Sequence, residues 1–288
     1  MSLVTPVRQW RARAGTALFL RVAGPHGIRS RERIHHRPGP RWFAPDAAIR
    51  EVHGDASMFV GGLRSLLLQS LHPVAMTAVA QHSGYRADPW GRLARTSTFL
   101  AVTVFGTADD AQAAVDAVRT IHGRVRGTTD DGVPYVADEP DLLRWVHVTE
   151  IESFLDAHRR WGERPLTPER ADEYVAQAAR IGRALGATDV PETVADLEAT
   201  IEGYRPVLRA TPAALDAATF LLREPPVPVA LRAGYSALAE AAVASLPAWA
   251  VTELGLRVPG PVRSRAALWA GDGATRTVRW LLAGQPTG

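Results

Sequence analysis

Residues 107–127 read TADDAQAAVDAVRTIHGRVRG, and this stretch indicates the kind of fold that the chain adopts. Thr107 with Asp110 has the form of a capping box at a helix start, and Gly127 marks a helix end. Between them, side chains on one face recur at spacings of four and three, as in an α-helix over 108–126. That face comprises Ala111, Val115, Val118, His122 and Val125. The pattern predicts an amphipathic helix that carries an imidazole on its apolar face.

The same punctuation by prolines, Asp or Thr caps and glycines recurs along the chain. Further helices are expected at 89–105, 140–162, from 168, from 191, and at 211–223, 227–245 and 263–283. Alternating β-branched runs of strand length are nearly absent. We therefore predict an all-α fold, with a single large domain of about ten or more helices over residues 46–288.

Composition excludes several kinds of chemistry. The chain has 288 residues, 46% of them hydrophobic and 22% charged, which is typical of a packed globular protein. It contains no cysteine and no lysine, so all 33 basic residues are arginine. Disulfides, thiolate metal sites, Schiff bases and the phosphate-loop lysine are thereby excluded. Dinucleotide and nucleophile-elbow motifs are also missing.

Positive charge is concentrated at the N-terminus. Residues 1–50 hold ten arginines against Glu32 and Asp46, a net charge of +8. We interpret residues 1–45 as a basic arm, either exposed to solvent or wrapped on a more acidic body. Binding of this arm to nucleic acid or to an acidic membrane surface is a weaker alternative, and no nucleic-acid partner is expected. Neither a signal peptide nor a transmembrane segment is evident, which favours the cytoplasm.

Two arginines and one threonine share a face of the helix expected at 89–105. Arg92, Arg95, Thr96 and Phe99 follow at spacings of three and four. Like charges one turn apart repel unless an anion lies between them. The face is either the cationic wall of a pocket or a solvated surface whose arginines reach water or neighbouring carboxylates.

Two histidines are candidate site residues. His122 is either a core residue satisfied by one hydrogen bond or a ligand, and Arg126, one turn later, requires solvent or an anion. His147 and Glu150 lie three apart on the helix expected at 140–162, whose Leu143, Val146, Phe154 and Ala157 are expected to face the core. A buried His–Glu pair there is structural, orients a catalytic group or perturbs a pKa.

Several segments in order resemble the MpaB-type oxygenases, which include the latex-clearing rubber oxygenases. They are GGLRSLLLQSLHP (61–73), GRLART (91–96), FGT (105–107), HGRVRG (122–127), YVA (135–137) and WVH (145–147). The resemblance covers roughly residues 45–255. It implies an all-helical domain with a heme-sized pocket between helices, and heme b bound with His122 as the proximal iron ligand.

The resemblance also assigns roles within the pocket. Arg92 and Thr96 match heme-pocket positions of the family. Arg95 replaces the distal lysine of rubber oxygenases, and a permanently protonated guanidinium cannot act as a reversible iron ligand. The segment 74–78 lacks the distal glutamate. Polyisoprene cleavage is therefore not carried over.

The leading hypothesis is a heme b-dependent oxygenase that oxidises a small apolar substrate with dioxygen. His122 would bind iron, Arg126 would pair with a heme propionate, and Arg92, Thr96 and His147 would complete the cofactor site. Arg95 and Thr96 are the candidate catalytic residues. The alternative is a helical binding or scaffold protein of the same fold that has lost the cofactor.

Overall fold

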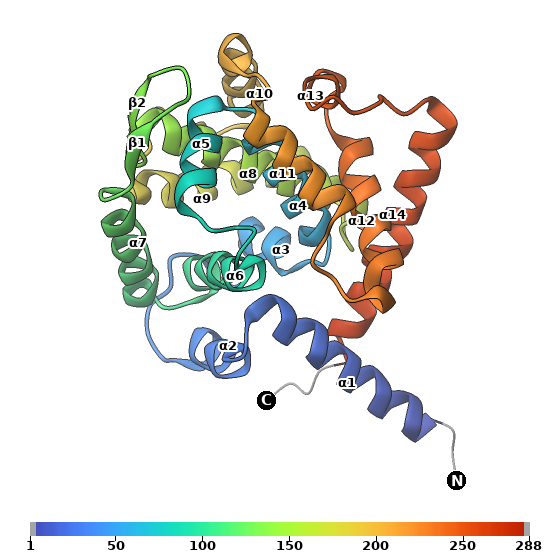
Figure 1. The fold of residues 1–288 in the computed structure, drawn as a ribbon. Helices are drawn as coiled ribbons and strands as arrows, with labels where there is room; N and C mark the ends of the chain where they lie inside the picture. Colours follow the sequence, from blue (N-terminus) through green and yellow to red (C-terminus); the bar gives the residue numbers. More distant parts are fainter. Residues whose placement is uncertain (1–3, 285–288) are drawn as a thin grey trace.

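The computed structural model describes residues 4–284, which are mostly helical (Figure 1). Its α-helices are α1 (Val4–Ala23), α2 (Gly27–His36), α3 (Ala48–Gly54), α4 (Met58–Gln69), α5 (Pro73–His82), α6 (Pro89–Phe105), α7 (Ala108–His122), α8 (Pro140–Trp161), α9 (Pro168–Leu185), α10 (Val194–Tyr204), α11 (Pro212–Arg223), α12 (Arg232–Ser245), α13 (Ala248–Glu253) and α14 (Pro261–Leu282). Strands β1 (Arg126–Thr128) and β2 (Pro134–Val136) form one antiparallel hairpin. The predicted all-α class and single helical domain are confirmed.

Side-chain caps begin several helices where the sequence predicts them. The Thr107 hydroxyl accepts a hydrogen bond from the backbone N–H of Asp110 at 3.2 Å. The Asp88 carboxylate accepts one from Gly91 at 2.9 Å at the start of α6. These caps satisfy backbone donors that the first turn leaves unpaired.

Two helices start three or more residues after the predicted position. Helix α10 begins at Val194 instead of 191, because the hydroxyl of Thr193 supplies the cap by accepting from Asp196 N. Helix α12 begins at Arg232, because Val229–Leu231 after Pro228 forms a 3₁₀ turn (η2). A second 3₁₀ turn, η1 (Arg205–Val207), continues α10.

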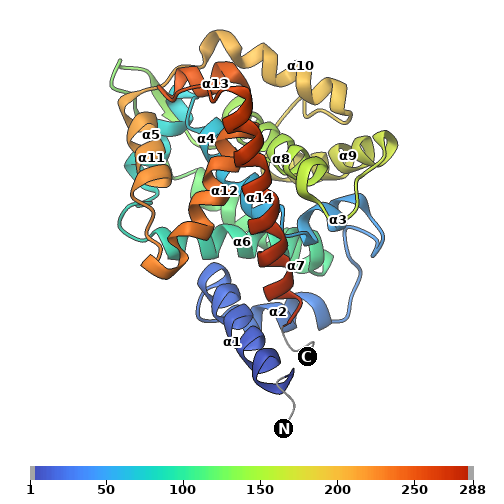
Figure 2. The same cartoon turned by 90° about the vertical axis from the view of Figure 1, so that its right-hand side faces the viewer.

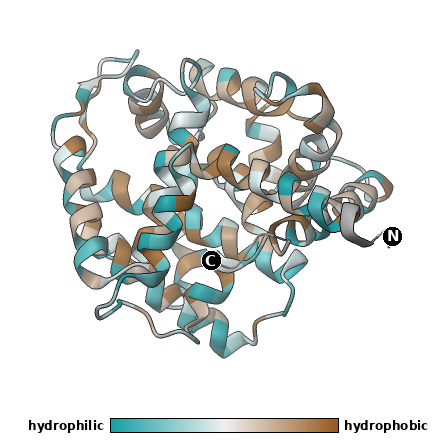
Figure 3. Ribbon diagram, turned by 90° about the horizontal axis from the view of Figure 1, so that it is seen from below, coloured by the Kyte–Doolittle hydropathy of each residue, from teal (hydrophilic) through white to brown (hydrophobic). Residues whose placement is uncertain are grey.

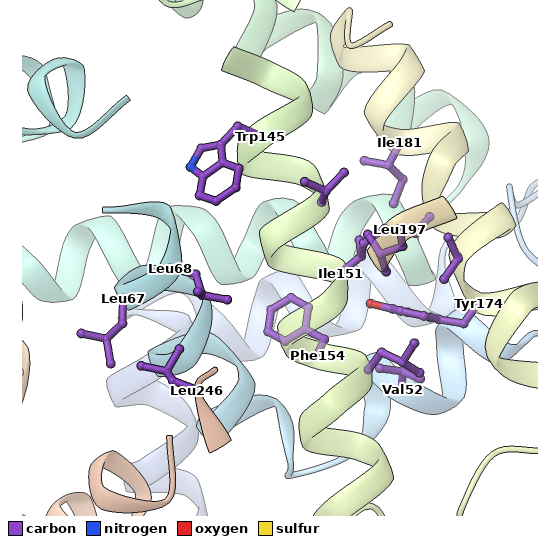
Figure 4. Close-up of a cluster of buried hydrophobic side chains, with 14 of the residues drawn as sticks. Val52, Leu67, Leu68, Trp145, Ile151, Phe154, Tyr174, Ile181, Leu197 and Leu246 are labelled. Atoms are coloured by element: carbon purple, nitrogen blue, oxygen red, sulfur yellow. The ribbon is translucent and has the colours of Figure 1, made fainter. Parts of the chain in front are cut away.

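The centre of the protein is the packing of α4 against α8. The main core gathers apolar side chains from these helices and from α3, α9 and α10 (Figure 4). Trp145 of α8 is fully buried, and its indole N–H donates to the carbonyl of Gln69 at 3.2 Å. His72 and Pro73 form the junction between α4 and α5, as the sequence suggests.

The other helices surround this centre. Helices α12 and α14 pack together on one side, α3, α9 and α10 lie on another, and α6 with α7 closes a third (Figures 1 and 2). Hydrophobic and hydrophilic residues alternate along most helices, which is typical of amphipathic helices (Figure 3). None of the helices within residues 4–284 has the length and apolar character needed to cross a bilayer.

The N-terminal segment is folded as α1 and α2. Both helices pack against α6, and α1 also packs against α14. Arg41 joins this segment to the body by donating to the backbone carbonyls of Ile34 and Phe105. The division at residue 45 stays a prediction, and residues 1–3 and 285–288 of the two predicted parts lie outside the described range.

Candidate functional site

His122 is the last residue of α7 and has no partner for its imidazole within residues 4–284. The side chain is half-buried. Burial lowers its pKa below the ordinary 6.5, and the nearby Asp138 carboxylate opposes this effect. The imidazole is therefore neutral at pH 7. A neutral imidazole with an uncommitted nitrogen is the state in which histidine binds a metal.

Arg126 is not on the helix that carries His122, so the predicted helix over 108–126 is wrong in its last turn. Helix α7 ends at His122, a turn follows, and Arg126 begins β1 opposite Val136. The chain leaves the helix because Ala137 N donates to Val125 O at 2.9 Å and starts the hairpin. Arg126 is exposed, and its guanidinium donates to the carbonyl of Gly123 at 3.0 Å.

Gly127 belongs to the hairpin and does not end a helix. A Cβ at this position would lie 2.6 Å from the Tyr135 hydroxyl and 2.8 Å from Gln81 Oε1. Only glycine allows this approach. The hairpin is thereby held against the end of α5, where His82 Nε2 lies 3.1 Å from the same hydroxyl.

The side chains on the predicted polar face of α6 differ in their exposure to solvent. Arg95 and Thr96 are exposed, and Arg95 pairs with the Asp88 carboxylate at 3.3 Å. Phe99 is half-buried against the main core. The two arginines on this face therefore lie in different surroundings.

Arg92 is the unpaired cation of this face. It is half-buried, and no hydrogen bond or ion pair joins it to another residue of the described chain. Burial lowers its pKa from the ordinary value, and the charge of Arg95 adds to the shift. A guanidinium stays protonated even so, and an uncompensated charge in this position favours binding of an anion.

His147 is buried on α8, but it does not pair with Glu150. Its Nε2 has no hydrogen-bond partner in the described residues, and a Cβ at Gly182 of α9 would lie 3.0 Å from the ring. Burial, aided by the charge of Arg183, lowers the His147 pKa to about 4. The ring is therefore neutral at pH 7.

One of the residues expected on the core face of α8 is exposed instead of buried. Leu143, Phe154 and Ala157 are buried as predicted, whereas Val146 is 38% exposed. Glu150, one turn further along α8, keeps accessible surface and accepts no hydrogen bond from any described residue. Burial nevertheless raises the Glu150 pKa to about 7. Desolvation causes this shift, because Glu150 is only partly exposed to water.

Two further polar residues with buried polar atoms were not predicted as site residues. Both ring nitrogens of His53 and the hydroxyl of Tyr174 are buried without partners. Their rings lie 6.0 Å apart, and Tyr174 reaches from α9 toward α8 (Figure 4). Burial and the charges of Glu150 and Glu152 raise the Tyr174 pKa well above its ordinary value. We name His53, Glu150 and Tyr174 the interior polar cluster.

The sequence held little signal for this cluster. His53 has no metal-ligand spacing, and Tyr174 lies among apolar residues of α9. Their proximity arises from the packing of α3 against α9 and α8. Nowhere in residues 4–284 do three His, Asp or Glu side chains converge as ligands for a free metal ion.

Two surface pockets lie apart from these residues. The larger, about 650 Å³, lies between α3 and the start of α9 and includes Arg50, Phe105 and Arg170 in its lining. The other is lined by residues such as Trp42, Glu173 and Arg180. Neither is lined by His122 or Arg92, so the heme-sized pocket stays a prediction.

Comparison with known proteins identifies the family of this chain. The chain belongs to the family described as "ER-bound oxygenase mpaB/B'/Rubber oxygenase, catalytic domain", whose model matches residues 50–280. The description of this family names oxygenases, which are oxidoreductases.

The curated relatives add no activity. Two uncharacterized proteins, Mb2261 of Mycobacterium bovis and Rv2237 of Mycobacterium tuberculosis, are each 36% identical over 105 residues. The aligned part is 36% of this chain and 39% of each relative. No solved structure shows significant similarity.

Proposed function

We propose that this protein is a heme b-dependent oxygenase that acts on a small apolar substrate with dioxygen, with His122 as the proximal iron ligand. The observation that carries the proposal is the state of His122: a neutral, half-buried imidazole without a partner in the described residues. Membership of an oxygenase family supports the reaction class. Bound heme would supply the activation of dioxygen.

The remaining side chains fit a group that is apolar and carries acidic tails. Arg92 supplies a half-buried cation without a counter-ion, which suits a propionate. His147 supplies a second neutral imidazole with an unused nitrogen, in a buried position suited to contact the cofactor. Arg126 remains a candidate partner of a propionate only from the hairpin, because its helical position is ruled out.

Arg95 and Thr96 are proposed to act on the substrate side. The Thr96 hydroxyl is exposed and makes no hydrogen bond to other described residues, so it is free to donate to a polar reacting atom. Arg95 offers a fixed positive charge that cannot exchange a proton at neutral pH. These two residues therefore orient and stabilise charge, and they do not perform acid–base catalysis.

Absorption spectroscopy tests this proposal. Purified protein titrated with hemin should develop a Soret band, and His122→Ala should abolish it while the far-ultraviolet circular dichroism stays unchanged. His36→Ala, on an exposed histidine of α2, is the matched control and should leave the band intact. His147→Ala tests the second imidazole and should weaken the band without removing it.

Two spectroscopic results would contradict the proposal or its assignment of the histidines. A colourless protein that takes up no hemin would refute the oxygenase proposal and favour the helical binding or scaffold protein. A normal Soret band in His122→Ala together with its loss in His147→Ala would exchange the roles of the two histidines.

A further inference from the structure

Helix α14 exposes three large apolar side chains along one line. Val262, Trp269 and Trp280 are 83%, 81% and 43% exposed. They are separated by seven and eleven residues, which correspond to about two and three helical turns. The line therefore runs along one face of α14 for about 27 Å.

The buried face of α14 fixes this orientation. Ala267, Gly271, Thr275 and Val278 face the body on the opposite side of the helix. A Cβ at Gly271 would lie 2.4 Å from the Cβ of Ala241 on α12, so the two helices are in close contact. The tryptophans point outward because the other face of a tightly packed helix is occupied.

Helix α1 extends the apolar line. Trp10 and Val7 are 60% and 56% exposed and lie one turn apart. The Trp10 and Trp280 ring centroids are 6.2 Å apart, and Arg11 Nε donates to the Trp280 carbonyl at 2.7 Å. Helix α14 lies nearest the viewer in Figure 2, with α1 below it. We name these five side chains (Val7, Trp10, Val262, Trp269 and Trp280) the tryptophan stripe.

The two helices that carry the tryptophan stripe are strongly basic. Helix α1 contains four arginines and no acidic residue, and α14 contains four arginines and only Asp272. Their net charge of +7 exceeds the +3 of the whole chain. Over residues 4–284, no ion pair joins Arg8, Arg13, Arg263 or Arg265 to a carboxylate.

We propose that the tryptophan stripe and its flanking arginines dock this protein on the surface of an anionic phospholipid bilayer. Indole rings prefer the boundary between headgroups and acyl chains, and arginines pair with lipid phosphates. A helix with an apolar line between arginines lies in the plane of such an interface. Nucleic acid would explain the arginines but not three exposed tryptophans, and this inference does not rest on the heme proposal.

Vesicle co-sedimentation tests the inference on the full chain. The protein should bind vesicles of equimolar phosphatidylcholine and phosphatidylglycerol, and binding to pure phosphatidylcholine should be at least tenfold weaker. Arg263→Glu with Arg265→Glu should weaken binding to the anionic vesicles roughly tenfold or more. Trp269→Ala with Trp10→Ala should do the same by removing interfacial anchors. Matched controls are Val229→Ala, 75% exposed elsewhere, and Arg223→Glu at the end of α11, and neither should change binding.

Each other outcome contradicts the inference. Equal binding to both vesicle types, or none to either, would overturn it, as would equal losses in the control variants. A dimer in size-exclusion chromatography that Trp269→Ala dissociates, without vesicle binding, would assign the stripe to a second copy of the chain. Binding to DNA that survives Trp10→Ala with Trp269→Ala, without vesicle binding, would assign the arginines to nucleic acid.

Discussion

Two arginines in this protein, one buried and one half-buried, have opposite surroundings. Arg64 of α4 is 2% exposed, and its guanidinium donates to both carboxylate oxygens of Glu152 and to the Ser153 hydroxyl. Arg92 of α6 is half-buried and has no partner among the described residues. At the centre of the fold, the buried cation Arg64 pairs with side chains of the protein itself. On the α6–α7 side, Arg92 has no such partner among the described residues.

The difference separates a charge used for folding from one available to a ligand. Burying a guanidinium is costly, so a protein that retains one without a counter-ion gives up stability at that position. Such a group is typical of binding sites, where the missing anion comes from outside. The α4–α8 contact is therefore structural, and the α6–α7 side is where we place the cofactor in our proposal.

The largest expected change in stability follows from removing Arg64, the cation that has partners. Arg64→Ala leaves the Glu152 carboxylate without its buried partner and should destabilise the protein by about 3–5 kcal/mol in urea unfolding. Arg276→Ala, which removes an exposed pair with Asp272, is the control and should cost at most about 1 kcal/mol. A loss below about 1 kcal/mol at Arg64 would break the comparison.

Glu150 of the interior polar cluster allows the same comparison for an acidic group without a partner. The Glu150 pKa is about 7 in the folded protein against an ordinary 4.5, so the folded state binds this proton more tightly. The stabilisation is present below pH 4.5 and is lost as pH rises to 7. At pH 8, Glu150→Leu should therefore be about 3 kcal/mol more stable than the wild type.

The pH series for Glu150→Leu separates this acid from the histidines. His53 and His147 have pKa values lowered to about 3 and about 4, so their stabilisation is present above pH 6.5 and is lost in acid. Both proteins share that acid loss, which cancels in the difference. A difference that stays constant between pH 4.5 and 8 would show that Glu150 is not buried as a neutral acid.

Removal of the unpaired cation Arg92 should change stability less than removal of Arg64, and in the opposite direction. Arg92→Met removes a half-buried charge and keeps much of the side-chain volume, so stability without cofactor should rise by about 1 kcal/mol. Hemin affinity should fall roughly tenfold if Arg92 holds a propionate. Arg95→Met, at an exposed ion pair, is the control for stability and should change it by less than about 0.5 kcal/mol. Unchanged hemin affinity in Arg92→Met would remove this residue from the site.

The smallest effect is expected at the hairpin. Arg126→Gln keeps a donor for the Gly123 carbonyl and should change stability by less than about 0.5 kcal/mol. Because Arg126 is exposed, hemin affinity should fall less than in Arg92→Met. Calorimetry and a hemin titration measure both. Unchanged hemin affinity would remove Arg126 from the proposed propionate partners.

Much of the fold was predictable because the helix signals are local. Thr107 caps α7, Asp88 caps α6 and Thr167 caps α9, as their spacing to the following residues suggests. The end of α7 was not predictable, because strand pairing of residues 126–128 with 134–136 competes with one more helical turn. The order of the family segments in the sequence likewise indicates the oxygenase family, which the family model confirms.

The amino-acid sequence by itself determined where most helices begin, that the chain is almost wholly helical, and that thiol and amine chemistry are missing. It also placed His122 and Arg92 on apolar and polar helix faces, because periodicity is a property of neighbouring residues. Only the tertiary structure decided that Arg64 has a partner while Arg92 has none among the described residues, and that the rings of His53 and Tyr174 lie side by side. The presence or absence of a partner depends on which distant segments pack together, and local sequence patterns do not predict that packing.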